Sequence, residues 1–429
     1  MKLRINKYLL LNVDKHIQDK IYMPDKKIIV QKFGGTSVKD PERIKAVAER
    51  IKSYTDRDYS VVVVVSAMGK TTDVLIDLAK EINSSPSRRE MDMLLSTGEQ
   101  VSTALLAIAL HAIGVDAISY TGSQIRLKTD GNFSNAKIAG ISTDRILKSL
   151  SENKVVIVAG FQGVDDDDNI TTLGRGGSDT SAVALAAVLN TRDCEIYTDV
   201  DGVYTADPRI IEKPRKLNEV SYDEMLELAR LGAGVLHSRS VEFAKKYNVR
   251  LHVRSSYSLD EGTILMPMEE MVEKFVISGI TAKQDEAKVT IREIPDSPGI
   301  AARIFNELGQ NRIYVNMIVQ STGYDNLASI SFTVKKDDLD NTISICKRLN
   351  ETLGGSSVEY KDNIAIVSAV GVGMLSSYGV AGKIFEILSG QNINIEMIST
   401  SEIGISCVID SIYSELATKL LHKEFVEAE

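Results

Sequence analysis

Short runs of apolar residues alternate with longer amphipathic segments in the N-terminal part of the chain. Residues 28–30, 61–65, 115–120, 155–159 and 195–199 are rich in β-branched or aromatic residues and predict β-strands. The consecutive valines at 61–65 are typical of a strand that is buried on both faces of a parallel sheet.

Helices are predicted between these strands. Asp40, Pro41 and Glu42 predict an N-cap, a proline at the first helical position and an acidic first turn for a helix that ends at about Ser53. Further helices are predicted at 101–113, 138–150 and 182–189. This alternation predicts an α/β fold with a mostly parallel sheet. Polar residues follow the carboxyl ends of several strands, which is where ligands bind in such sheets.

A different pattern repeats itself after about residue 280. Residues 302–305 match 382–385, and residues 316–318 match 396–398, both with an offset of 80 residues. Each copy predicts a strand, a loop with Gly299 or Gly379, a helix and a second strand. Neither copy shows a catalytic motif built on a nucleophile or an acid/base pair, so we expect ligand sensing, with a purely structural role as the alternative.

Composition excludes several classes of function. The 429 residues carry a net charge of −9, which disfavours nucleic acid as a partner, and they are enough for two or three domains. Three distant cysteines, Cys194, Cys346 and Cys407, give no disulfide framework and fit a reducing cytoplasm. The histidines lack metal-ligand spacing, so no protein-built metal site is expected. The longest apolar runs are too short to span a bilayer, so no membrane partner is expected.

The first 26 residues precede the first predicted strand and are expected to form an N-terminal extension. The alternative is that Met23 is the true translation start. Residues 9–11 are leucines in a basic segment, but the run is too short for the core of a signal peptide.

The richest polar motif is the run Gly174-Arg175-Gly176-Gly177-Ser178-Asp179, which an apolar helical segment follows. A glycine turn that leads into a helix N-terminus forms an anion site from free N–H groups. Arg175 can hold a carboxylate or phosphate with two parallel hydrogen bonds, and Asp179 supplies the opposite charge. The motif therefore predicts a ligand that carries charges of both signs.

Lys32 ends the first predicted strand, just before Gly34 and Gly35. An ammonium group beside free backbone amides predicts binding of a transferred phosphoryl group, and the alternative is an ordinary surface lysine. The sequence Gly69-Lys70-Thr71 is not a P-loop, because that motif needs a glycine at position 64, which is a valine.

Other acidic residues leave alternatives open. Glu99, at the start of the helix predicted at 101–113, either complements the helix dipole, which local features favour, or reaches a ligand ammonium. Asp199 ends a strand and either binds nucleotide or Mg²⁺, with Tyr204 against a base, or belongs to a polar turn. The acidic run at 165–168 favours a solvated loop over a metal site.

In their order along the chain, these motifs resemble the signatures of aspartate kinases in the amino acid kinase family. The matching stretches are Lys32-Phe-Gly-Gly-Thr-Ser37, Ser66-Ala67, Gly69, Thr71, Gly98-Glu99, Gly174 to Asp179, Thr198-Asp199, Asp207-Pro-Arg209 and Gly232-Ala233 with Val235-Leu236-His237. The C-terminal repeat resembles paired ACT domains, and the likeness covers residues 27–425. It implies a three-layer αβα kinase domain at 27–280. It also implies ACT domains of βαββαβ, ferredoxin-like topology at 287–360 and 361–429, intertwined through the C-terminal strand.

The resemblance implies an activity and a set of roles. The γ-phosphoryl group of ATP, bound with Mg²⁺, would pass to the β-carboxylate of L-aspartate, giving 4-phospho-L-aspartate and ADP, the first step toward lysine, threonine and methionine. Lys32 and Asp179 would be catalytic. ATP contacts would be Lys32, Gly34, Gly35, Thr198, Asp199, Tyr204 and Arg209. Substrate contacts would be Thr71, Glu99, Arg175, Ser178 and Asp179. The Mg²⁺ would arrive with ATP rather than on protein ligands.

The resemblance also implies feedback inhibition by lysine, threonine or both, in a homodimer or homotetramer paired through the ACT domains. Effector contacts in the second repeat would be Met374, Ser377, Gly379, Val380, Asn394, Ile395, Glu396, Thr400 and Ser401. Their counterparts in the first would be Asp296, Gly299, Ala301 and Gln320. Glu396 would meet the ammonium group of the effector.

One position departs from the family pattern: Gly234 stands where many members have a lysine, so weaker ATP binding is expected. The alternative is that Lys213 or Arg215 supplies the missing nucleotide contact. Two other functions stay open at this stage. One is a non-catalytic amino acid sensor with a degenerate kinase domain. The other is a kinase for a different small acid, such as glutamate, against which Glu99 and the ACT pair argue.

Overall fold

The structure is a computed structural model that describes residues 26–271, 275–323 and 326–427. The predicted N-terminal extension, apart from its last residue, lies outside the described residues. The chain forms two compact units. Among the described residues, the first combines 26–203, 216–226 and 234–271, and the second combines 204–215, 227–233, 275–323 and 326–427.

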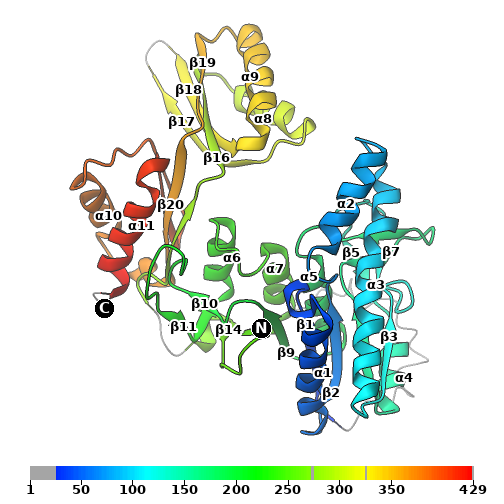
Figure 1. Ribbon diagram of the computed structural model, residues 1–429. Coiled ribbons are helices and arrows are strands. Elements are labelled where there is room, and N and C mark those ends of the chain that lie inside the picture. Colours follow the sequence, from blue (N-terminus) through cyan, green and yellow to red (C-terminus); the bar gives the residue numbers. More distant parts are fainter. Residues whose placement is uncertain (1–25, 272–274, 324–325, 428–429) are drawn as a thin grey trace, which may run out of the picture. The chain divides into compact units, whose positions relative to one another are not determined.

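The first unit is built on an eight-stranded sheet with the order β12-β14-β13-β9-β1-β2-β6-β3 (Figure 1). Its strands are β1 (Ile28–Phe33), β2 (Ser60–Val65), β3 (Ala117–Tyr120), β6 (Val155–Ala159), β9 (Asp193–Thr198), β12 (Glu219–Ser221), β13 (Arg250–Ser255) and β14 (Thr263–Met266). Neighbouring strands run parallel except β13 and β14. Every residue of β2 is buried, as the valine run predicts. The α/β class with a mostly parallel sheet is therefore confirmed.

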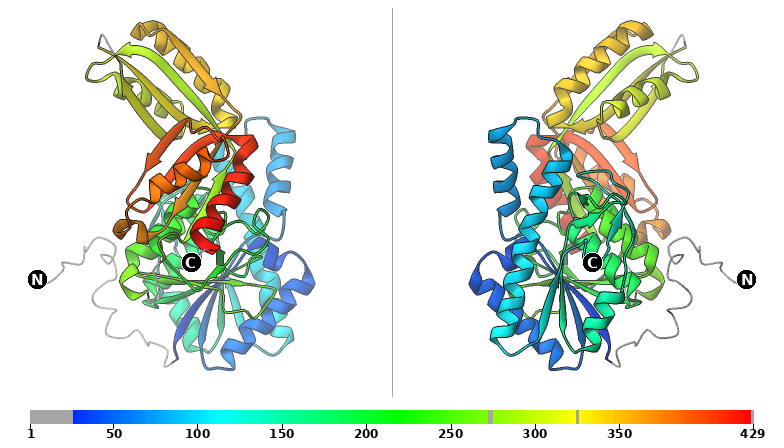
Figure 2. Two further views of the ribbon diagram at one scale, coloured as in Figure 1. Left: turned by 90° about the vertical axis from the view of Figure 1, so that its left-hand side faces the viewer. Right: turned by 90° about the vertical axis from the view of Figure 1, so that its right-hand side faces the viewer.

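Helices lie on both faces of this sheet (Figure 2). On one face, α1 (Pro41–Thr55) and α3 (Arg88–Ala112) share a core with alternate residues of β1 and β2. On the other, α5 (Gly177–Val188) packs on β1, β2 and β9 and against α7 (Ser238–Tyr247). The remaining elements of this unit are η2 (Gly35–Val38), α2 (Thr71–Ile82), β4 (Lys128–Thr129), β5 (Ile138–Gly140), α4 (Asp144–Ser151), β7 (Gln162–Val164), β8 (Ile170–Thr172), β11 (Lys216–Leu217) and η3 (Met268–Glu270). Two elements, β10 (Val203–Tyr204) and α6 (Tyr222–Arg230), include residues of both units.

Two predicted helices differ from those observed. The helix predicted at 138–150 is a strand, β5, which pairs with β4, followed by the shorter α4. The helix predicted at 101–113 is the second half of α3, which begins thirteen residues earlier, where the Ser87 side chain caps the amide of Glu90. Glu99 is therefore a mid-helix residue. Its interpretation as an acid at a helix start is wrong.

Helix α3 is long and apolar enough to cross a membrane by length and composition, so the expectation that the longest apolar segments are too short to span a bilayer does not hold for this helix. Half of its apolar window is buried inside the protein, and the helix carries the buried carboxyl groups of Asp92 and Glu99. Both features are those of a core helix.

The second unit contains two four-stranded sheets. The sheet β17-β18-β16-β19 is formed by β16 (Glu286–Pro295), β17 (Val315–Thr322), β18 (Leu327–Lys335) and β19 (Ser357–Lys361), and α8 (Ile300–Gln310) and α9 (Leu339–Leu353) pack with it. The sheet β15-β20-β22-β21 is formed by β15 (Gly279–Lys283), β20 (Ile364–Val370), β21 (Met397–Thr400) and β22 (Gly404–Asp410), with α10 (Val380–Ser389) and α11 (Ser414–His422). Short helical turns are η4 (Lys336–Asp338), η5 (Val372–Ser376), η6 (Ser411–Tyr413) and η7 (Lys423–Glu427).

The two repeats are joined in an order that differs from the expectation. The strand β15 precedes the whole first repeat in sequence, yet it pairs antiparallel with β20 of the second repeat. The first repeat is thus inserted into the second. The link is β15 and not a C-terminal strand, because the described chain ends in the helical segments α11 and η7.

Equivalent residues of the repeats occupy equivalent places. Gly299 and Gly379 both cap their helices with left-handed backbone, at φ of 97° and 86°. Met317 and Met397 meet in one small apolar cluster with Ile364, which joins the two sheets. The sequence repeat is therefore a structural repeat.

Candidate functional site

The site is centred on the carboxyl end of β1. Lys32 is 9% exposed, and its Nζ lies 2.6 Å from Oδ1 of Asp179, in the first turn of α5. Strand alternation explains the contact, because Lys32 points toward α5 whereas its neighbour Gln31 points toward α1 and bonds to Glu195. Two residues that the motifs predicted to be functional thus form an ion pair.

The loop after β1 needs its glycines for close approach. A Cβ on Gly35 would lie 2.8 Å from the carbonyl oxygen of Ala67. The amide of Gly34 donates to the carbonyl of Tyr197 (3.1 Å), and that of Gly69 donates to Gly35 (3.0 Å). Backbone hydrogen bonds therefore join the loop that follows β1 to the end of β9 and to the loop that follows β2.

The loop before α5 is the second glycine-rich element. Gly174 and Gly176 have φ of 76° and 71°, which favours glycine. A Cβ on Gly176 would lie 2.3 Å from the Cβ of His237, so the loop packs directly against the N-cap of α7. Burial lowers the pKa of His237, which keeps its imidazole neutral beside this loop.

Glu99 brings a buried carboxyl group to the same place. It is 3% exposed, its Oε1 accepts from the amide of Ala67 (3.1 Å), and its Oε2 has no hydrogen-bond partner among the described residues. Burial raises the pKa of Glu99 to about 7, although the bond from Ala67 works in the other direction. Gly98 allows this approach, because a Cβ there would lie 2.8 Å from the Ala67 side chain. An unsatisfied buried carboxyl oxygen is a ready acceptor for a ligand ammonium group.

These groups surround one cavity of about 350 Å³. Its lining residues are Lys32, Gly35, Ser66, Ala67, Gly69, Thr72, Glu99, Phe161, Gly174, Arg175, Gly176, Gly177, Ser178 and Asp179. Of the predicted substrate contacts, Glu99, Arg175, Ser178 and Asp179 come together here. Thr71 does not line the cavity, because its hydroxyl donates to the carbonyl of Met68, and its neighbour Thr72 lines it instead.

The predicted nucleotide contacts other than Lys32, Gly34 and Gly35 fall into two groups. Thr198 and Asp199 end β9, which lies beside β1, and the Thr198 hydroxyl donates to Asp199 (3.1 Å). Tyr204 and Arg209 belong to the second unit. There Arg209 binds Asp207 through Nη2 and Oδ2 at 2.6 Å, which lowers the pKa of that carboxyl group.

Sequence reasoning missed the residues that hold the second glycine loop. Asp92, fully buried on α3, accepts from the amide and hydroxyl of Thr172 (2.7 and 2.8 Å) and from those of Ser134 (2.8 and 3.1 Å). Arg239 of α7 donates to the carbonyl groups of Leu173 and Ala136. The one signal for Asp92 is its spacing, seven residues before Glu99, which places both acids on one face of a helix.

The described residues contain no group of three or more His, Cys, Asp and Glu side chains that could hold a metal ion. A metal bound to phosphate oxygens needs few protein ligands, and Asp199 at the end of β9 is of the required type. Gly234 is exposed, and a Cβ there would have no atom within 4 Å, so a longer side chain would fit.

The predicted effector residues of the second unit lie mainly around the helix starts and edge strands of the repeats. Gly299, Ala301, Gly379 and Val380 are at the starts of α8 and α10, and Thr400 ends the edge strand β21. Glu396 already has two partners: Lys361 Nζ at 2.6 Å and Lys288 Nζ at 3.1 Å. Burial works to raise the pKa of Glu396, but the bonds from both lysines outweigh it and lower the pKa.

Two protein-family models match the chain, one in its N-terminal part and one in its C-terminal part. A model of the amino acid kinase family matches residues 27–255, and an ACT domain model matches 292–348 and 367–425. The chain is 51% identical over 399 residues to an aspartate kinase of Stutzerimonas stutzeri, covering 93% of this chain and 97% of that protein.

Two solved structures of an Escherichia coli enzyme, aspartokinase III, are similar over nearly the whole chain. The complex with aspartate and ADP has a TM-score of 0.78 at 25% identity, covering 92% of this chain and 99% of that one. The complex with lysine and aspartate has a TM-score of 0.73 at 25% identity, covering 93% and 99%.

Proposed function

Because the chain belongs to the aspartate kinases of the amino acid kinase family and is an ATP-dependent kinase, we propose that it phosphorylates the β-carboxylate of L-aspartate. The γ-phosphoryl group of MgATP passes to that carboxylate, and the products are 4-phospho-L-aspartate and ADP. The observation that carries this proposal is the cavity in which Lys32, Glu99, Arg175 and Asp179 meet, since its charges complement an amino acid with a second carboxylate.

Each end of the substrate has a complementary group. Arg175 binds the α-carboxylate through its planar guanidinium, and the open oxygen of Glu99 accepts from the α-ammonium group. Ser178 and Asp179 complete the wall at the N-terminus of α5. The β-carboxylate is then left facing Lys32.

Phosphoryl transfer needs positioning and charge neutralisation more than acid/base chemistry. The acceptor carboxylate has an unperturbed pKa of about 3.9, so it is ionised at neutral pH and needs no general base. Lys32 and the amides of the loop at Gly34 and Gly35 stabilise the charge on the transferring group. Thr198 and Asp199, in the same unit as Lys32, would hold the nucleotide or its Mg²⁺, and the metal would supply further neutralisation of the phosphate charge.

The C-terminal repeats supply regulation in this proposal. The lysine complex of the E. coli relative supports lysine as the effector, alone or with threonine. The apolar side chains of Ile318 and Ile398, exposed on the edge strands β17 and β21, support pairing of subunits through the ACT domains into a dimer or tetramer. The enzyme then catalyses the first step toward lysine, threonine and methionine. A cytoplasmic location fits its three buried free cysteines.

A hydroxylamine trap tests the activity. The purified chain is incubated with MgATP, hydroxylamine and either L-aspartate or L-glutamate, and the amino acid hydroxamate is measured. Aspartyl hydroxamate alone is expected. Glutamyl hydroxamate would indicate a kinase for a different acid, and no product with either would indicate an amino acid sensor. In the same assay, Arg175→Ala is expected to raise the aspartate KM at least about tenfold, with lysine and threonine added separately to identify the inhibitor.

A further inference from the structure

The connection between β13 and β14 contacts the loop that follows β1 and the end of β9. The amide of Ser256 donates to the carbonyl of Thr198 (2.8 Å), directly before Asp199. The hydroxyl of Tyr257 donates to the carbonyl of Thr36 (3.0 Å), directly after Gly34 and Gly35. We name residues 256–260 the strap. It joins the loop that carries Gly34, Gly35 and Thr36, which we call the phosphoryl loop, to the loop that begins at Thr198 and Asp199, which we call the nucleotide loop.

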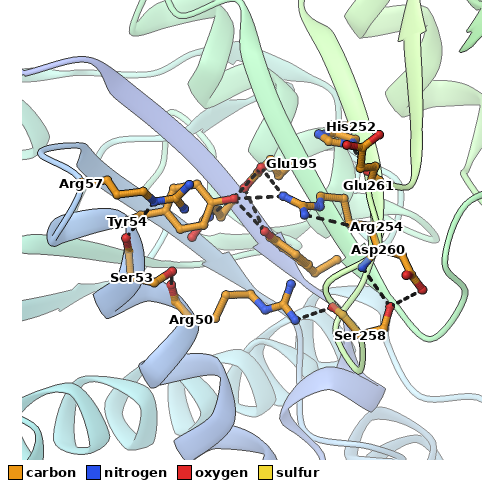
Figure 3. A network of polar contacts seen from close by, with 12 residues as sticks. Arg50, Ser53, Tyr54, Arg57, Glu195, His252, Arg254, Ser258, Asp260 and Glu261 are labelled. Carbon is orange, nitrogen blue, oxygen red and sulfur yellow. Dashed lines mark hydrogen bonds and ion pairs between the residues drawn. The ribbon is translucent and has the colours of Figure 1, made fainter. Parts of the chain in front are cut away.

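Alternate carbonyl groups of the strap each accept a hydrogen bond from a different arginine. The pairs are Arg43 with Ser256 at 2.6 Å, Arg50 with Ser258 at 2.7 Å and Arg254 with Asp260 at 3.4 Å. The last two are drawn in Figure 3. The guanidinium of Arg43 also lies 3.9 Å from the centre of the Tyr257 ring. Arg43 and Arg50 come from α1, which begins just after the phosphoryl loop.

Arg254, the third of these arginines, belongs to a network of buried and partly buried polar side chains centred on Glu195 (Figure 3). Glu195 accepts from Arg254 Nη1 (3.2 Å), from the Tyr54 hydroxyl (2.7 Å), from the Tyr197 hydroxyl (3.0 Å) and from Gln31 Nε2 (2.7 Å). Burial raises the pKa of both tyrosines, so their hydroxyl groups stay protonated and can donate. The network joins β1, β9, β13 and α1, the elements that carry both loops.

Apolar burial does not explain the strap. Tyr257 is 49% exposed and Leu259 is 83% exposed, so the strap adds little to the hydrophobic core. Its contacts are polar and are directed at backbone groups next to the proposed functional residues. Polar contacts of this kind fix geometry and contribute modestly to stability.

We propose that the strap holds the phosphoryl loop in register with the nucleotide loop, and that Tyr257 is a positioning residue for phosphoryl transfer, acting through the backbone of Thr36. This inference rests on the proposed kinase function. The backbone amides of Gly34 and Gly35 are proposed to stabilise the negative charge that develops on the phosphoryl group in the transition state. A small displacement of the loop would move these amides away from that charge and slow the transfer.

The test compares wild type with Tyr257→Phe, which removes the hydroxyl group and keeps the ring on Arg43. The matched control is Tyr360→Phe, at another exposed tyrosine, in β19. We measure kcat, the KM values for ATP and aspartate, the melting temperature, and MgADP binding by calorimetry. For Tyr257→Phe, kcat/KM for ATP is expected to fall about three- to tenfold, with the aspartate KM and the melting temperature unchanged.

Each outcome decides between a positioning and a structural role. If kcat and the ATP KM of Tyr257→Phe match those of wild type, the inference is overturned. It is also overturned if both KM values rise together with a loss in melting temperature, because that marks a general structural defect. A wild type without kinase activity would contradict the proposed function alone, since weaker MgADP binding by Tyr257→Phe would still support the strap.

Discussion

Lys32 Nζ lies 2.6 Å from Asp179 Oδ1, so the two side chains proposed for catalysis form an ion pair. The pair joins the end of β1 to the first turn of α5, and both side chains are almost entirely buried. An ammonium group has three donors, so an ion pair with one carboxylate leaves donors for a phosphoryl oxygen. Asp179 therefore fixes the lysine in place before the phosphoryl group arrives.

Replacing either member of this pair is expected to lower kcat to a different extent. Lys32→Met removes the charge that neutralises the transferring group, and kcat should fall by about 100- to 1,000-fold. Asp179→Asn keeps the lysine but weakens its anchor, so a smaller loss of about tenfold is expected. Steady-state kinetics measures both. Lys27→Met, which breaks a pair with Asp193 at the other end of β1, is the control. A Lys32→Met enzyme with near wild-type kcat would refute the assignment.

The aspartate KM is expected to depend on pH through Glu99. The pKa of this buried group is raised to about 7, so the group is increasingly protonated as the pH falls below 7. A protonated carboxyl group binds the substrate ammonium poorly. The aspartate KM should therefore rise about tenfold per unit below pH 7 and level off above it. The charged groups Lys32, Arg175 and Asp179 share the cavity with Glu99.

Two variants isolate that dependence. Glu99→Gln cannot ionise, so its aspartate KM should be high and nearly flat between pH 6 and about 8. Glu90→Gln, in the exposed first turn of the same helix, should keep the wild-type profile. Kinetics at saturating ATP measure both. A wild-type KM that stays constant from pH 6 to about 8 would show that Glu99 does not titrate in this range.

Local motifs were sufficient to predict the loops of the site. Lys32 lies at the end of β1, and the run from Gly174 to Asp179 leads into α5. Both elements have strong apolar patterns, and a parallel sheet brings the loops after its strands to one edge. The position of Glu99 within its helix was not predictable in this way. It depends on a cap at Ser87, outside the apolar part of α3 from which the helix was predicted.

Long-range partners account for the rest. In the sequence, nothing distinguishes Asp92 from other acidic residues of a helix. Its role depends on hydrogen bonds from Ser134 and Thr172, which are distant in the sequence. The repeat was visible in the sequence as an offset of 80 residues. The insertion of the first repeat into the second was not visible in the sequence. It depends on the pairing of β15 with a strand about 85 residues later, and β15 carries no matching motif.

Gly234→Lys is expected to strengthen ATP binding. The position is exposed, its backbone is not in the left-handed region, and a Cβ there meets no atom within 4 Å, so the side chain should be accommodated without strain. A lysine ammonium on a phosphate should lower the ATP KM by about tenfold. Gly234→Ala, which adds no charge, should leave it unchanged. An ATP KM that is equal in all three proteins would refute the idea that this glycine weakens nucleotide binding.

The ion cluster at Glu396 gives a prediction for the regulatory repeats. Lys288 and Lys361 both bond to this carboxylate, and its pKa is lowered. A lowered pKa means that the contribution to stability is present at neutral pH and is lost as the pH falls through the folded-state pKa. Glu396→Gln should therefore melt about 2–4 °C below wild type at pH 7, and the difference should shrink under acidic conditions. Glu351→Gln, exposed on α9, is the control.

The same variant tests whether the effector binds at Glu396. Both carboxylate oxygens already accept from lysines, so an effector ammonium group must compete with Lys288 or Lys361. If it does so, Glu396→Gln should raise the lysine concentration needed for half-inhibition at least about tenfold, while the uninhibited kcat stays the same. Unchanged inhibition together with the loss in melting temperature would restrict Glu396 to joining the two repeats, and the effector ammonium group would then bind elsewhere in the second unit.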